Sequence, residues 1–135
     1  MEKEERMKEL YMQFQMLNQQ MEQVSQHLEM LTQQNAELDI SINAISELNT
    51  VKPGNEFLAP VADGIFLKGE IKETDKLIVN VGSNTTVERT IPEVITLLEK
   101  QKNELGERMK EADAFMQELS KEAMRIYKVV EEKSE

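Results

Sequence analysis

The chain has 135 residues, and its aromatic content is only 4 %, with no Trp. A single thick globular core is not expected, because aromatic side chains normally supply much of the volume of such a core. The formal net charge of −10, from 26 acidic and 16 basic side chains, would repel phosphate backbones and anionic membrane surfaces, which argues against nucleic acid and membranes as partners.

Apolar residues recur at alternating steps of three and four through the first third of the chain. Only Asn35 breaks the apolar set, and no Gly or Pro interrupts it. A 3.5-residue period keeps one narrow seam facing a partner helix, so residues 1–50 are expected to form an N-terminal coiled-coil helix. The predicted seam consists of Met7, Leu10, Phe14, Leu17, Met21, Val24, Leu28, Leu31, Asn35, Leu38, Ile42 and Ile45.

Residues 51–90 change character. The KPG segment at 52–54 is expected to stop the first helix, and β-branched residues then alternate with polar ones. Turn signals at residues 63–64, 73–75 and 82–84 predict four short strands, or two β-hairpins. Apolar residues occupy both strand faces, and about 35 residues cannot cover both faces alone. The hairpins are therefore expected to form an oligomerisation body, a β-barrel shared between subunits. Its expected contact residues are Ile65, Phe66, Leu67, Ile71, Leu77, Val79, Val81 and Val87.

Residues 91–135 repeat the seam pattern, which predicts a C-terminal coiled-coil helix. Its start is marked by Thr90 and Glu93, which have the spacing of a capping box, and by Pro92 in the first turn. Gly106 lies next to the seam and should cost about 1 kcal/mol relative to Ala. The predicted second seam consists of Ile91, Ile95, Leu98, Lys102, Leu105, Met109, Ala112, Met116, Leu119, Ala123, Ile126 and Val130.

Two seams of equal length around a short insert predict that the helices pair antiparallel within one subunit. With residue 48 opposite residue 91, the polar seam members Asn35 and Lys102 would fall near one level, and Phe14 would face the small Ala123. These matches favour an intramolecular hairpin over two helices that each seek another chain. A polar layer of this kind commonly fixes register at some loss of stability.

Apolar residues overflow the seam near both chain ends. Tyr11, Met12 and Met16 lie off the first seam, and Met124, Tyr127 and Val129 lie off the second. Met side chains adapt to many partners, which suits a binder of unlike unfolded chains, although the seam methionines can equally be core filling. The residues expected to bind substrate are Met7, Leu10, Tyr11, Met12, Phe14, Leu17, Met116, Leu119, Met124, Ile126, Tyr127 and Val130.

No pattern of an enzyme emerges. His27 is the only histidine, and there is no Cys, which fits a reducing compartment. Gly64 and Gly69 have the spacing of a phosphate loop, but Glu70 stands where the required Lys would be. No metal, cofactor or catalytic group is expected. The charged segment MEKEERMKEL lacks a signal-peptide apolar core, and no apolar run reaches the ~18 residues of a membrane span, so a cytoplasmic location is expected.

The order helix, two hairpins, helix resembles the prefoldin family in its archaeal alpha form. The most specific segments are IKETDKLIVNVG and VERTIPEVITLLEK, and the second hairpin favours alpha over beta. The resemblance implies a hexamer of two alpha and four beta subunits with a double β-barrel body. It also implies ATP-independent capture of non-native polypeptides at the coiled-coil tips and their transfer to a group II chaperonin. The alternative from the residues alone is a passive coiled-coil scaffold or adaptor that oligomerises through its β insert.

Overall fold

The computed structural model describes residues 2–134, with side chains described as far as Glu132. The chain runs through helix α1 (Glu2–Glu47), one 3₁₀ turn (Leu48–Thr50), strands β1 to β4 and helix α2 (Ile91–Ser134). It divides into two compact units. The terminal unit contains the α1 residues as far as Asn35 and the α2 residues from Glu104 onward. The strand unit, Ala36–Asn103, contains the remainder of both helices and all the strands of the described chain.

The predicted seams are confirmed by burial. Every predicted seam residue of α1 and of α2 is buried or half-buried, and Leu31 and Ile126 are only 1 % exposed. Most other positions of both helices are exposed. A stripe of this kind forms when a 3.5-residue repeat keeps one face against a neighbouring helix. The sequence pattern did not mark Val94, which is also buried and lies three residues after Ile91 in the first turns of α2.

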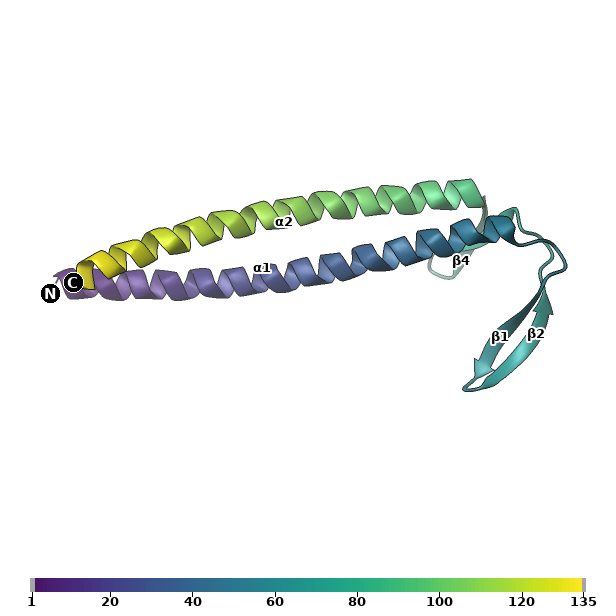
Figure 1. The fold of residues 1–135 in the computed structure, drawn as a ribbon, viewed down its shortest axis with the longest axis horizontal. Helices are drawn as coiled ribbons and strands as arrows, with labels where there is room; N and C mark the ends of the chain where they lie inside the picture. Colours follow the sequence, from purple (N-terminus) through teal and green to yellow (C-terminus); the bar gives the residue numbers. More distant parts are fainter. Residues whose placement is uncertain (1, 135) are drawn as a thin grey trace. The chain divides into compact units, whose positions relative to one another are not determined.

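In the terminal unit the two helices lie side by side and run antiparallel (Figure 1). Phe14 of α1 meets Tyr127 of α2, with ring centroids 6.5 Å apart and ring planes tilted by 37°. Further along, Val24 of α1 lines one groove together with Ala112 of α2. The ascending residue numbers of one helix therefore meet the descending numbers of the other. The first turn of α1 and the last turn of α2 lie next to each other.

In the strand unit, Lys102 has a partner that the heptad pattern did not indicate. Its ammonium group donates a hydrogen bond to the carboxylate of Asp39 on α1, and the two groups form an ion pair. Asp39 follows the seam residue Leu38, so it flanks the apolar stripe. A long lysine side chain can reach such a flanking carboxylate while its methylene groups stay against apolar neighbours. The contact joins the two helices within this unit.

The first hairpin pairs β1 (Glu56–Ala62) with β2 (Ile65–Glu70), and Gly64 takes a positive φ of 75° in the turn between them. The strands form a separate two-stranded sheet with a bulge between Pro60 and Ala62. The chain enters this hairpin through a turn at residues 52–55. There the Gly54 N–H donates to the Ile71 carbonyl and the Ile71 N–H donates to the Asn55 carbonyl. These bonds fix the start of the hairpin to its end.

The second hairpin pairs β3 (Lys76–Gly82) with β4 (Thr85–Thr90). Ser83 and Asn84 both have positive φ, which is the backbone of a tight two-residue hairpin turn. Residues 71–75, which include the predicted turn at 73–75, connect the two hairpins instead of closing one. The register shifts between Asn80 and Gly82, so the predicted alternation of Leu77, Val79 and Val81 ends at Val79.

Helix α2 begins directly after β4. The Thr90 hydroxyl accepts a hydrogen bond from the Glu93 N–H, which is half of the predicted capping box. The carboxylate of Glu93 lies 3.8 Å from Arg89 and forms an ion pair with it. Thr90 is still paired with Lys76 of β3, so the hairpin leads into the helix without an intervening loop.

Candidate functional site

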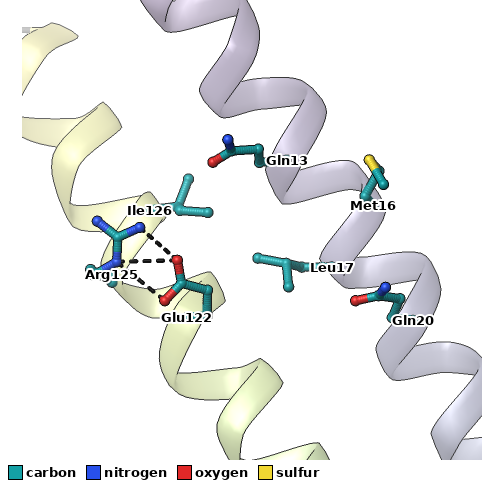
Figure 2. Close-up of a pocket in the computed structure, with 7 residues that line it drawn as sticks. All are labelled: Gln13, Met16, Leu17, Gln20, Glu122, Arg125 and Ile126. Atoms are coloured by element: carbon teal, nitrogen blue, oxygen red, sulfur yellow. Dashed lines mark hydrogen bonds and ion pairs between the residues drawn. The ribbon is translucent and has the colours of Figure 1, made fainter.

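The terminal unit contains an open groove between α1 and α2 with a volume of about 370 Å³. Its floor is apolar, because Leu17 and Ile126 point toward each other from the two helices, as Figure 2 shows. Both are seam residues predicted to bind substrate. We call this site the terminal groove, and its lining consists of Gln13, Met16, Leu17, Gln20, Glu122, Arg125 and Ile126.

The charged pair at one side of the terminal groove comes entirely from α2. The Nη2 group of Arg125 donates to Oε1 of Glu122 at 2.6 Å, and its Nε group donates to both carboxylate oxygens at 3.2 Å. The spacing of three residues brings both side chains to one helix face. The hydrogen bond from Arg125 lowers the pKa of Glu122, and the same bond raises the pKa of Arg125. Both groups therefore stay charged at neutral pH.

Apolar side chains gather outside the seam near the groove. Each of them is more than half exposed although the helices are paired, so the fold does not bury them. They come from short segments of both helices, residues 11–16 of α1 and 124–127 of α2, whereas exposed apolar side chains on a protein surface normally occur singly. We call these residues the off-seam set, and they are Tyr11, Met12, Met16, Met124 and Tyr127.

The residues predicted to bind substrate fall into two environments. One group belongs to the seam and is buried or half-buried: Met7, Leu10, Phe14, Leu17, Met116, Leu119, Ile126 and Val130. The other group lies in solvent: Tyr11, Met12, Met124 and Tyr127. The structure brings Phe14 to Tyr127 and Leu17 to Ile126. Val129, which the sequence also placed off the seam, is half-buried.

The polar lining of the terminal groove was not predicted. Gln13 and Gln20 are seven residues apart on α1, so they lie on one flank of the seam. Glu122 and Arg125 line the same groove from α2. A heptad count extended to the positions beside the seam could have found these residues, because flanking positions of paired helices face each other.

The hairpins present a second apolar surface. In the first hairpin Ile65, Phe66 and Leu67 are all exposed. Successive residues of β2 point to opposite faces, so apolar side chains are exposed on both faces of this strand. Val81 of the second hairpin is exposed, while Leu77 is half-buried. Ile71, Val79 and Val87 are half-buried as well. An isolated two-stranded hairpin is only marginally stable in water and normally needs other strands or a helix packed on its apolar face. In this chain the apolar side chains of the first hairpin have no such cover.

Features typical of a metal site or of a membrane span were sought among the described residues. Residues 2–134 contain no group of three or more His, Cys, Asp or Glu side chains that could hold a metal ion. His27 is exposed and lines a groove in the terminal unit with Val24 and Phe115. No helix among these residues is both long enough and apolar enough to cross a membrane.

Comparison with known proteins agrees with this architecture. A family model described as "Prefoldin subunit" matches residues 2–135. The chain is 34 % identical to the prefoldin subunit alpha of Pyrococcus horikoshii over 85 % of this chain and 78 % of that protein. It is 33 % identical to the alpha subunit of Thermofilum pendens, over 70 % of each chain.

Among solved structures, a chain of the filamentous PFD from Methanocaldococcus jannaschii, determined by cryo-EM, has a similar fold. The TM-score is 0.58 and the sequence identity 22 %, with 89 % of this chain and 93 % of that chain covered. The two chains therefore share a fold although their sequences are only weakly similar. With helices, hairpins and relatives all in agreement, the chain belongs to the prefoldin family, and within it to the archaeal alpha type.

Proposed function

We propose that the chain is a subunit of an ATP-independent holdase that captures non-native polypeptides at its terminal unit. A chaperone role in general follows from membership of the prefoldin family. The location of capture rests on one observation: the off-seam set is exposed although the seam beside it is paired and is buried or half-buried. Tyr127 also touches Phe14, but each of these side chains keeps more than half of its surface in solvent and is available to a client.

The chemistry of the off-seam set suits clients of unlike sequence. Three of its members are methionines, whose unbranched side chains and polarizable sulfur adapt to different apolar surfaces. The terminal groove adds an apolar floor, Leu17 and Ile126, between rims of amide and charged groups. Such rims can bond to the backbone of an extended peptide, whereas the floor receives its side chains. Binding of this kind needs no nucleotide, because it is driven by removal of apolar surface from water.

The hairpins are proposed to join subunits. Apolar side chains on both faces of β2 would be covered if hairpins of several chains closed a β-barrel, which removes unpaired strand edges. The family resemblance supports a hexamer of two alpha and four beta subunits and delivery of clients to a group II chaperonin. In that assembly the residues of the oligomerisation body would be Ile65, Phe66, Leu67, Ile71, Leu77, Val79, Val81 and Val87.

The function is tested by making the off-seam set polar without touching the seam. A variant with Met12→Gln, Met16→Gln and Met124→Gln should keep its helix content and oligomeric state, because these side chains are already in water. It should lose most of its suppression of aggregation of a chemically denatured client protein. The matched control changes Met30→Gln and Ile40→Gln, two exposed off-seam positions away from the off-seam set.

The control variant should suppress aggregation as the unchanged chain does. Undiminished suppression by the triple variant would contradict the proposed site. It would favour the alternative of a passive scaffold, particularly if the chain also reached its final oligomeric state without a second type of subunit.

A further inference from the structure

The outer face of α2 next to the terminal groove carries a cluster of cations. This face consists of Ser120, Lys121, Met124, Arg125 and Lys128, which together line a shallow groove of about 350 Å³. We call it the cationic face. Arg125 lines both this face and the terminal groove, so the two sites share an edge. Met124, a member of the off-seam set, lies in the middle of the cations.

From the charge of this face we propose that the terminal unit prefers client segments in which acidic residues flank apolar ones. The inference rests on the proposed holdase function and names the client chemistry at that same site. A client side chain that covers Met124 would bring its sequence neighbours within reach of Lys121, Arg125 and Lys128. Carboxylates at those neighbouring positions would be attracted, and amines would be repelled.

The charges near the binding site determine this preference, even though the net charge of the whole chain has the opposite sign. The formal net charge is −10, but at physiological ionic strength charges further apart than about 8 Å are largely screened from each other. Within residues 120–128 the three cations outnumber the single anion, Glu122. That carboxylate is already hydrogen-bonded to Arg125, which leaves the two lysines to define the sign of the potential. Glu118 lies three residues before Lys121, and Glu131 and Glu132 lie three and four residues after Lys128, so anions border the cationic face at both ends and limit it to about two helical turns.

Three fluorescent peptides with one apolar core, flanked by Glu, by Ser or by Lys, provide the test with the full-length chain. We expect the Glu-flanked peptide to bind about fivefold more tightly than the Ser-flanked one, because two or three exposed ion pairs contribute modestly each. The Lys-flanked peptide should bind most weakly. The differences should disappear at high salt, at which exposed charges are screened.

Variants separate this inference from the proposed function. Lys121→Gln with Lys128→Gln should remove the preference for Glu flanks and leave the affinity for the Ser-flanked peptide unchanged. Lys100→Gln with Lys110→Gln changes the net charge equally at exposed positions outside the cationic face, and it should keep the preference. Equal binding of the Glu- and Ser-flanked peptides would overturn the inference, as would a preference that survives loss of both lysines. If the unchanged chain binds no peptide at all, the proposed function fails instead.

Discussion

Two residues on one turn of α2 should separate folding from client capture. Ile126 is 1 % exposed and belongs to the seam, whereas Met124, two positions earlier, is 56 % exposed. Helical geometry turns the chain by about 200° between them, so they face opposite directions. We therefore predict that Ile126→Ala destabilises the paired helices and that Met124→Gln weakens capture without affecting stability.

The magnitudes follow from burial. Truncating a fully buried Ile to Ala costs about 2–5 kcal/mol, the sum of lost transfer free energy and the cavity that remains. The lower part of that range applies here, because neighbouring seam residues such as Val130 are only half-buried and can move into the space. Met124→Gln changes a side chain that is mostly in water already, so its effect on the free energy of unfolding should stay within about 0.5 kcal/mol.

The assay measures both quantities on each variant. Thermal unfolding followed by far-UV circular dichroism, read near the chain's own transition, reports stability. Suppression of aggregation at a temperature well below that transition reports capture. The reasoning is refuted if Met124→Gln lowers the melting temperature as much as Ile126→Ala does, or if Ile126→Ala leaves that temperature unchanged.

Three further predictions concern single positions. Gly106→Ala should raise stability by about 1 kcal/mol in denaturant unfolding, because Gly106 is helical and a Cβ there meets no other atom within 4 Å; a decrease would show a hidden steric constraint. Gly69→Ala should disturb the first hairpin, because its Cβ would lie 2.6 Å from the ring of Phe57, and slower assembly or a shifted Phe57 environment in NMR would report it; an unchanged spectrum would contradict the contact. Since the pKa of Glu122 is lowered in the folded chain, its bond to Arg125 adds stability above the unfolded pKa, and that contribution is lost as the pH falls through the folded value. Glu122→Gln should remove this small acid-dependent component from unfolding titrations, and an unaltered pH profile would count against it.

The seams could be predicted from sequence because a heptad repeat is a property of one helix. The heptad period marks the buried face of a helix whichever helix it pairs with. The seam from Met7 to Ile45 could therefore be predicted without knowing where α2 packs. The pairing between Asp39 and Lys102 depends instead on the register of two helices and on a long flexible side chain. Heptad phase alone does not specify either of these.

Parts of the hairpins were harder to predict for a different reason. Pro60 and the adjacent bulge interrupt the alternation of β1, and a second bulge at Val81 ends the alternation of β3. A period-two pattern loses its meaning at such a position, because the extra residue shifts the following side chains. The Glu122–Arg125 pair was missed because charged residues on a helix surface are common, and only the groove beside them gives the pair significance.

The central claim is that non-native clients contact the off-seam set. Site-specific photo-crosslinking tests it most directly, with one photoreactive residue introduced at Met16 and, in a separate variant, at Ile40, which is slightly more exposed. Our account predicts that a denatured client crosslinks to position 16 and leaves position 40 unlabelled, and that an excess of an unlabelled unfolded protein competes for the reaction. Equal crosslinking at both positions, or crosslinking at position 40 alone, would contradict it.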